Sequence, residues 1–233
     1  MEQMIREGLL EMGLSLEAAP ALAEYGRLLL EKNQVMNLTA LREPEQVARL
    51  HFLDSAGLFG AADLAGKKVI DIGSGGGFPG LPLRLIEPSI QLTLLDALGK
   101  RVTWLSEVTQ ALGTADVTCI HARAEEQALL PDYREQFDIA TSRAVADLRV
   151  LAELCLPYVK PGGAFLAMKS VDSEEELSAA LRGIQLLGGD MGAAHDYRIP
   201  GTDVIHRILV IKKAGPTPKG YPRRWAKIQK APL

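Results

Sequence analysis

Several residue types that would define a special class of protein are scarce in this chain. Among 233 residues there are only two cysteines, Cys119 and Cys155, which excludes a disulfide scaffold and a multi-cysteine zinc site. We interpret both as buried small hydrophobic residues. No apolar run approaches the roughly 20 residues that a membrane-spanning helix needs. The charged start MEQMIREGLL is not typical of a signal peptide. These absences predict a soluble, cytoplasmic protein with no membrane partner and no metal.

Aromatic residues are also scarce, at 5%, so the core must consist mainly of Leu, Val, Ile and Ala. The apolar content of 47% and the charged content of 24% are ordinary for a globular protein and argue against disorder. No repeat and no linker rich in Gly, Ser or Pro divides the chain. We therefore expect a single domain over residues 1–233, with a helical cap (1–60), a core (61–212) and a basic tail (213–233).

Acidic residues are absent from the C-terminal end of the chain. From Val204 onward there are eight Lys and Arg residues and no Asp or Glu, although the net charge of the whole chain is −3. The rest of the chain therefore carries a charge of −11. An acidic body with a basic tail indicates a polyanionic partner, and a solvated tail with incidental charge is the alternative.

The order of apolar segments predicts the fold. Leu22, Tyr25 and Leu29 follow helical spacing near the N-terminus, and Pro44 is a favourable first residue for a further helix. Beyond Lys67, short apolar strands alternate with helical stretches, which favours a parallel sheet covered by helices on both faces. The predicted strands are residues 69–72, 91–96, 116–120, 137–141, 164–169 and, as an antiparallel edge, 204–211. A capping box of Ser173 and Glu176 is expected to begin the helix after the fifth strand.

A glycine-rich loop, Asp71-Ile-Gly-Ser-Gly-Gly-Gly-Phe-Pro-Gly80, directly follows the first strand. Glycines permit positive φ angles and a close approach of a ligand to the backbone. Gly75, Gly77 and Gly80 match the dinucleotide pattern G-x-G-x-x-G, but a glycine-rich string matches many patterns. Asp71 with Gly73, Gly75 and Gly77 matches the loop of S-adenosylmethionine enzymes. The carboxylate of Asp71 favours that cofactor, because it would be unhelpful beside a pyrophosphate.

Acidic residues after the next two strands are candidates for contacts with an adenosyl group. Asp96 ends the second strand, where a carboxylate can accept both ribose hydroxyls. NAD shares this feature, so Asp96 indicates an adenosyl cofactor without choosing between the two. Ala124 and Glu125 follow the third strand and could reach the adenine edge. A surface acidic pair, Glu125 with Glu126, is the other interpretation.

Two signatures of nucleobase methylation are missing. Methylation at carbon-5 of a pyrimidine needs a cysteine nucleophile, and neither cysteine follows a proline. Methylation of an exocyclic amine usually uses Asn/Asp-Pro-Pro-aromatic at the fourth strand, where this chain has residues 141–144, Thr-Ser-Arg-Ala. A ring nitrogen such as guanine N7 already carries a lone pair and needs neither motif. The four histidines show no metal-ligand spacing, and we interpret them as structural or surface residues.

These blocks together resemble one family. Residues 37–55 (NLTALREPEQVARLHFLDS), 71–83 (DIGSGGGFPGLPL), 94–105 (LLDALGKRVTWL) and 141–144 (TSRA) resemble the bacterial 16S rRNA guanine-N7 methyltransferase family, also called glucose-inhibited division protein B. The resemblance runs from about residue 15 to residue 224. It implies a Rossmann-like class I S-adenosylmethionine methyltransferase that acts on guanine-527, in the standard 16S numbering, within the small ribosomal subunit or an assembly intermediate.

The resemblance also implies site residues. Cofactor contacts carry over to Gly73, Phe78, the Ala124–Glu125 pair and Arg143, beside Gly75, Gly77 and Asp96 from the loop argument. The basic Tyr/Phe-Pro-Arg segment of the family matches residues 221–224, which makes Arg223 and Arg224 candidates for RNA contacts. Asn37 and Arg42 in the N-terminal helices are further candidates. The ending Trp225-Ala-Lys-Ile228 departs from the family, which usually has a Gly- and Pro-rich ending there.

Three other functions stay open at this point. A methyltransferase of the same fold could act on a small molecule, which would not require a basic tail. An NAD(P)-dependent reductase would need a Tyr/Lys or His/Asp catalytic pair that the sequence does not show plainly. A nucleic-acid-binding protein without catalysis would have no use for the glycine loop. No residue is predicted as a general base.

Overall fold

A seven-stranded sheet lies at the centre of the computed structural model, which describes residues 1–143 and 146–233. Ala144, the last residue of the TSRA block, falls outside these ranges. The strand order is β3-β2-β1-β4-β5-β7-β6. β1 to β5 pair in parallel, and β7 runs antiparallel to both of its neighbours, β5 and β6. The strand bounds are β1 Lys68–Ile72, β2 Gln91–Asp96, β3 Thr118–His121, β4 Phe137–Arg143, β5 Val159–Ser170, β6 Gly189–Arg198 and β7 Ile205–Lys213.

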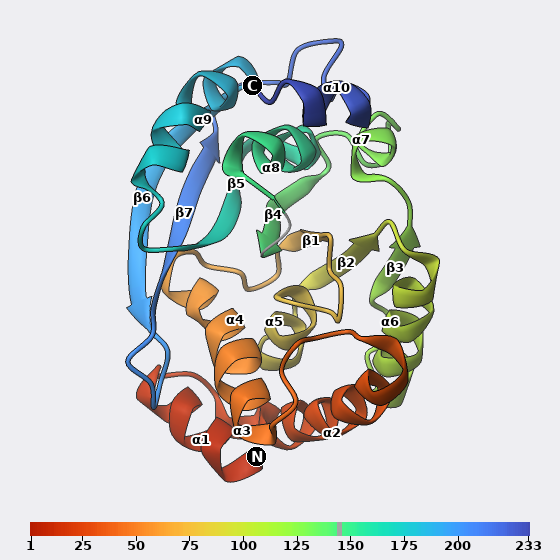
Figure 1. The fold of residues 1–233 in the computed structure, drawn as a ribbon, viewed down its shortest axis with the longest axis vertical. Helices are drawn as coiled ribbons and strands as arrows, with labels where there is room; N and C mark the ends of the chain where they lie inside the picture. Colours follow the sequence, from red (N-terminus) through yellow and green to blue (C-terminus); the bar gives the residue numbers. More distant parts are fainter. Residues whose placement is uncertain (144–145) are drawn as a thin grey trace.

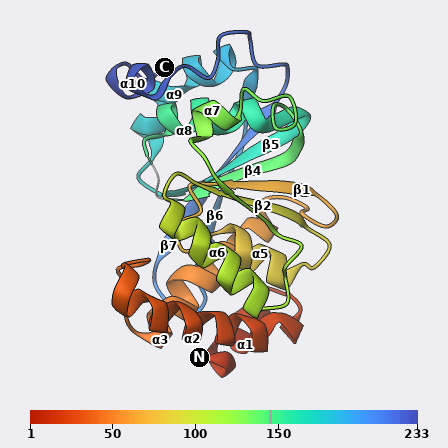
Figure 2. The ribbon, with the colours of Figure 1, turned by 90° about the vertical axis from the view of Figure 1, so that its right-hand side faces the viewer.

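Helices cover both faces of the sheet, as Figures 1 and 2 show. Below it in Figure 1 lie the N-terminal helices together with α5 and α6, and above it lie α7 to α10 near the C-terminus. The bounds are α1 Glu2–Glu11, α2 Ala19–Met36, α3 Pro44–Val47, α4 Asp54–Ala56, α5 Gly80–Ile86, α6 Gly99–Ala111, α7 Ala124–Gln127, α8 Leu148–Cys155, α9 Glu174–Leu186 and α10 Trp225–Lys230. The mostly parallel, doubly covered architecture predicted from the sequence is confirmed.

Two apolar clusters correspond to the two faces. Leu22, Tyr25 and Leu29 of α2 are fully buried in the cluster on one side of the sheet, as their helical spacing predicts. The other cluster joins α8 and α9 to the opposite face and includes Ile70 of β1 and Phe165 of β5. Because the central strands are buried on both faces, they read as near-continuous apolar runs.

The helix that begins at Pro44 changes its winding before it ends. After α3, a π-helical segment covers Ala48–Leu53, and α4 and a 3-10 turn, Gly57–Gly60, continue it. Wider π turns are often found at functional sites, because they shift the direction in which side chains point. Here the segment presents His51 and Asp54 toward the sheet.

Two local predictions are wrong. The sequence pattern predicts the last strand at the edge of the sheet, but β6 is the edge and β7 lies between β5 and β6. β6 was missed because GDMGAAHDYR contains no β-branched residue, and its pairing with β7 determines its conformation. The predicted capping box does not form either. Ser173 makes no capping hydrogen bond, and the Glu176 carboxylate instead binds the backbone N–H of Leu148 and, at 2.5 Å, the ammonium of Lys169.

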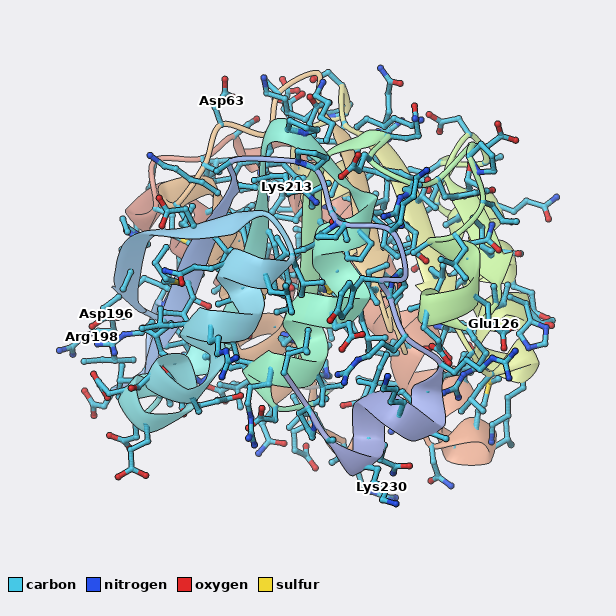
Figure 3. The ribbon with its side chains drawn as sticks, turned by 90° about the horizontal axis from the view of Figure 1, so that it is seen from above. Asp63, Glu126, Asp196, Arg198, Lys213 and Lys230 are labelled. Carbon is cyan, nitrogen blue, oxygen red and sulfur yellow. The ribbon has the colours of Figure 1, made fainter. Side chains whose placement is uncertain are left out.

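The C-terminal segment is folded onto the layer of α7 to α10 (Figure 3). Arg134 donates hydrogen bonds to the carbonyl oxygens of Thr217 and Tyr221, both at 2.8 Å. The side chain of Lys213 is fully buried and donates to the carbonyl oxygen of Leu156 at 2.8 Å. In Figure 3, Lys230 projects from α10 away from the body, whereas Lys213 lies within it.

Among the described residues, no helix is both long enough and apolar enough to cross a bilayer.

Candidate active site

A cleft of about 930 Å³ opens at the carboxyl ends of the parallel strands. Ligands of open α/β sheets bind at this edge, where the strand order reverses. One wall, the glycine-loop wall, comprises residues 73–76, Phe78, residues 96–98, Arg101 and Arg123. The other, the cap wall, comprises residues 38–41, Leu50, His51, Asp54, Arg143, residues 168–170 and His206.

The glycine loop needs its glycines for two different reasons. Gly73, Gly75 and Gly77 have φ angles of +73°, +59° and +112°, in the region that L-residues with side chains rarely adopt. A Cβ at Gly77 would lie 2.3 Å from the hydroxyl of Tyr25, so this glycine also allows α2 to pack against the loop. Tyr25 and Trp104 both donate to the carbonyl oxygen of Gly76, at 2.6 and 3.1 Å. The loop is therefore fixed from behind, and its backbone faces the cleft at Gly75.

Asp96 lies at the tip of β2, beside this loop, with 3% of its surface exposed. One carboxylate oxygen accepts the N–H of Gly75 and the other accepts the N–H of Leu98, both at 2.9 Å. Arg101 lies 3.5 Å from the carboxylate. These contacts hold the side chain in place, and each carboxylate oxygen has further lone pairs for a ligand in the cleft.

Asp71 does not have the ligand-facing position that its place at the end of the first strand predicts. Its side chain is fully buried and does not line the cleft. One oxygen accepts the N–H of Gly80 at 2.9 Å, at the first residue of α5. The other has no hydrogen-bond partner among the described residues. Burial raises the pKa of this carboxyl to about 7. Asp71 thus organises the loop from the protein interior.

A stack of rings joins the two walls. Phe78, from the glycine loop, lies between Tyr25 and His51, with ring centroids 5.4 and 4.2 Å away. The guanidinium of Arg143 lies 5.1 Å from the centroid of Phe78. It donates to His51 Nδ1 at 2.9 Å and to the carbonyl oxygen of Leu50 at 3.2 Å. Because Arg143 can only donate, His51 carries its proton on Nε2, which donates to the Thr39 hydroxyl at 2.7 Å.

Asp54 is the polar anchor of the cap wall. Its carboxylate is almost fully buried and accepts hydrogen bonds from three side chains that come from three different strands. Arg143 of β4 binds at 2.8 Å, Tyr197 of β6 at 2.7 Å and His206 of β7 at 2.7 Å. A buried carboxylate is stable only with such partners, so the four groups form one unit.

The pKa values of the two histidines of this wall are shifted in opposite directions. Burial, followed by the nearby Arg143 charge, lowers the pKa of His51 to about 3, so this ring is neutral. The hydrogen bond to Asp54 raises the pKa of His206 above its usual value. Burial alone would raise the pKa of Asp54, but the hydrogen bond from His206 and the charge of Arg143 hold it below its usual value.

The structure brings five of the eight predicted cofactor residues to the cleft: Gly73, Gly75, Phe78, Asp96 and Arg143. Gly77 packs behind the loop. Ala124 and Glu125 are buried next to the rim, where Glu125 pairs with Arg123 at 3.0 Å, and neither lines the cleft. Cofactor contacts by all eight stay predictions.

The four predicted RNA residues lie outside the cleft. Asn37 and Arg42 are exposed on the cap, and Arg224 is exposed in the tail. Arg223 differs from these three exposed residues, because its guanidinium forms an ion pair with the fully buried Glu153 at 2.6 Å.

Sequence reasoning missed the anchor and both histidines. Asp54 and His51 were part of a matched block, but nothing in it indicates that Asp54 meets residues 89, 143 and 152 positions later in the chain. A local pattern that could have pointed to this wall is the spacing of His51 and Asp54, three residues apart on one helical segment.

Among the described residues, no group of three or more His, Cys, Asp or Glu side chains is arranged to hold a metal ion.

Comparisons with known proteins agree with this architecture. The profile of the family described as rRNA small subunit methyltransferase G (GidB) matches residues 18–197. The ribosomal RNA small subunit methyltransferase G of Alkaliphilus oremlandii is 44% identical over 238 residues, which covers 100% of this chain and 99% of the relative. That of Clostridium beijerinckii is 43% identical over 221 residues, covering 94% and 92%.

Solved structures share the fold at low identity. A SAM dependent methyltransferase from Aquifex aeolicus is 16% identical, with a TM-score of 0.56 and coverage of 75% of this chain and 96% of that one. The YcgJ protein of Bacillus subtilis is 17% identical, with a TM-score of 0.52 and coverage of 71% and 100%.

Proposed function

Because the chain belongs to the rRNA small subunit methyltransferase G family, we propose that it transfers a methyl group from S-adenosylmethionine to N7 of guanine-527 in 16S ribosomal RNA. The observation that carries this proposal is the cleft, which joins a glycine loop and a strand-end carboxylate to a second, polar wall. The first wall suits a cofactor, and the second, apart from Arg143, suits an acceptor base. The cytoplasm is the compartment that contains this RNA.

The residues of the glycine-loop wall fit an adenosyl cofactor. At Gly75 an added Cβ would have no neighbour closer than 3.9 Å, so the absence of a side chain leaves room for a ligand against the backbone. Asp96 is held so that a ribose could meet its remaining lone pairs. We propose Gly73, Gly75, Phe78, Asp96 and Arg143 as cofactor contacts, with Gly77, Ala124 and Glu125 supporting them from behind.

The chemistry requires alignment rather than proton transfer. S-adenosylmethionine supplies a methyl group on a positively charged sulfur. When both reactants are bound, the N7 lone pair would take this methyl group, the S–C electron pair would stay on sulfur, and the positive charge would move to guanine. No proton leaves N7, so no general base is needed. His51 could not serve as one, because Arg143 occupies Nδ1 and Nε2 carries the proton.

The protein contribution is therefore to hold the two reactants in line and to exclude water. The buried carboxylate of Asp54 fixes the side chains of the cap wall before the RNA arrives. An exposed, unpaired guanine is needed, because the N7 edge must enter the cleft, and unpaired RNA elements can present a base in this way. Asn37 and Arg42 on the cap, and Arg224 in the tail, are proposed RNA contacts, whereas the ion pair of Arg223 gives it a structural role.

Labelled methyl transfer tests the proposal directly. Purified protein is incubated with methyl-labelled S-adenosylmethionine and with 16S rRNA, small subunits or assembly intermediates that lack the modification. We expect about one methyl group per RNA, which mass spectrometry places at N7 of guanine-527, and no transfer by Gly75→Val. Transfer to a small molecule but to none of the RNAs, or tight binding of NAD(P)H without binding of S-adenosylmethionine, would overturn it.

A further inference from the structure

Most arginines of the body are neutralised within the protein. Arg27 pairs with Glu24 at 2.7 Å, Arg207 with Asp196 at 2.6 Å, and Arg84 with Asp116 at 3.0 Å. In the tail the pattern changes. Within the part of the chain that the structure describes, no carboxylate oxygen lies within 4.0 Å of the charged nitrogens of Arg224, Lys227 or Lys230, and all three residues are exposed. A body with an excess of acidic residues thus leaves these three cations without a partner.

Lys227 and Lys230 lie on the short helix α10, Arg224 directly precedes it, and the helix is packed onto the body. Ile228 of α10 is fully buried in the apolar cluster of α8 and α9, and Trp225 packs against the same cluster. Two residues before α10, Arg223 donates hydrogen bonds to the buried Glu153 carboxylate. Its backbone N–H binds at 2.8 Å and its guanidinium at 2.6 Å. The three-residue spacing keeps Lys227 and Lys230 on one side of α10, away from the seat. α10 is therefore a fixed element and not a flexible arm.

One contact connects α10 to the cleft. The guanidinium of Arg123 lies 4.9 Å from the centroid of the Trp225 ring, and Arg123 itself lines the glycine-loop wall. Arg123 Nε also donates to Glu125 at 3.0 Å, which fixes its direction. Trp225 belongs to the ending that departs from the family pattern. Its contact with Arg123 shows what this ending does in the fold: it joins α10 to the rim of the cleft. The cationic face of α10 consequently begins beside the rim of the cleft.

We propose that Arg224, directly before α10, and Lys227 and Lys230 on α10, which is seated through Trp225 on Arg123, form a docking surface for consecutive RNA phosphates. This inference rests on the proposed function, which supplies the polyanion, and it adds where the RNA backbone lies when a base enters the cleft. A helix held in place presents its charges without first losing the conformational entropy of a free tail.

Salt dependence of RNA binding measures the phosphate contacts. The affinity for a 16S rRNA transcript is determined between about 50 and 200 mM salt for the wild type and for Arg224→Gln/Lys227→Gln/Lys230→Gln. Each lost phosphate contact flattens the log–log slope by about 0.7, so we expect a change of about 2. Arg6→Gln/Arg27→Gln/Arg198→Gln is the matched control, since it removes the same charge from the half-buried Arg6 on α1 and the exposed Arg27 on α2 and Arg198 on β6. Its slope should equal that of the wild type.

The seat is tested separately from the charges. Trp225→Ala removes the platform under Arg123 and keeps all three cations, and we expect RNA affinity to fall roughly tenfold. Trp225→Phe retains an aromatic ring and should retain most of the affinity. If Trp225→Ala melts at a much lower temperature, the comparison rests on the phenylalanine variant and the triple variant.

The possible results separate this inference from the function. An unchanged slope in the triple variant, an equal change in the matched control, or full RNA affinity in folded Trp225→Ala would overturn the docking surface. Methylation of the transcript, of small subunits and of assembly intermediates that lack the modification is followed in parallel with the wild type. Tight RNA binding with methyl transfer to none of these substrates would overturn the proposed function and leave the docking surface standing.

Discussion

The glycine-loop wall of the cleft is formed by residues that are close in the sequence, whereas the cap wall is assembled from distant ones. Asp96 accepts the N–H of Gly75, 21 positions earlier, and that of Leu98, two positions later. Asp54 accepts hydrogen bonds from side chains 89, 143 and 152 positions away. Backbone conformation creates the first wall, and burial of a single carboxylate among long-range partners creates the second.

The sheet order separates the two walls in space. Asp96 ends β2 and His206 belongs to β7, with β1, β4 and β5 between them. At about 4.8 Å per strand, the two ends of the cleft are roughly 19 Å apart. A ligand held by Asp96 therefore leaves the far end for a second molecule. The comparison predicts that changes in the glycine-loop wall alter cofactor affinity and that changes around Asp54 alter acceptor methylation.

The largest expected effect is that of Gly75→Val. A branched side chain at a φ of +59° would be strained and would project toward the space that the cofactor needs. We expect the affinity for S-adenosylmethionine, measured by calorimetry, to fall more than about a hundredfold, which corresponds to about 2.7 kcal/mol.

Gly66→Val is the matched control for this change. Gly66 also has a positive φ, +68°, and has open space around its Cβ position, but it does not line the cleft. Its variant should show a similar loss of thermal stability with unchanged cofactor affinity. Equal cofactor affinities in the two variants would remove the glycine loop from the binding site.

Asp96→Asn should have the next largest effect. One hydrogen bond to a charged partner contributes about 1.5–3 kcal/mol, so we expect cofactor affinity to fall roughly tenfold to a hundredfold. Glu126→Gln on the neighbouring α7 is the control, because Glu126 is exposed and outside the cleft. Cofactor binding that is indifferent to Asp96→Asn would mean that the strand-end carboxylate only supports the loop.

Much of the first wall could be predicted from the sequence because local patterns determine it. The strand, the glycines and Asp96 were all found, since backbone conformation and strand ends have short-range signatures. Asp71 was assigned to the correct strand end, but burial and the N–H of Gly80 direct its carboxylate inward. No local pattern reveals which of two carboxylates at neighbouring strand ends faces a ligand.

The second wall could not be predicted, because its contacts depend on β6 and β7. β6 has little intrinsic strand preference, yet it positions Tyr197 beside His206 in the register. Glu176 matched a capping box, but Lys169 and the N–H of Leu148 offered it charge-assisted partners instead. In both cases tertiary pairing overrode the local signal.

A smaller effect distinguishes the two histidines of the cap wall through the pH dependence of stability. The folded-state pKa of His51 is lowered to about 3, so the unfolded chain binds a proton more readily between pH 6.5 and 3. Stability is therefore lost as the pH falls through this window, by about 2 kcal/mol between pH 7 and 5. His51→Gln should abolish this loss in urea titrations at the two pH values.

His206 should act in the opposite direction. Its pKa is raised by the hydrogen bond to Asp54, so its contribution is fully present below the unfolded pKa and is lost as the pH rises through the folded one. His206→Gln should therefore make the protein more sensitive to acid in the same urea titrations. The same pH dependence in the His51→Gln and His206→Gln variants would contradict the opposite pKa shifts of the two histidines.

The most direct test of the division between the walls compares two isosteric variants, Asp96→Asn and Asp54→Asn. Cofactor affinity is measured by calorimetry, and single-turnover methylation of 16S rRNA is measured at saturating S-adenosylmethionine. The account predicts that Asp96→Asn weakens cofactor binding at least tenfold and recovers a near wild-type rate at saturation. Asp54→Asn should lose less cofactor affinity than Asp96→Asn and should methylate at least tenfold more slowly at saturation, because His206 and Arg143 both lose their anchor. Equal losses of cofactor affinity in both variants, with equal rates at saturation, would contradict it.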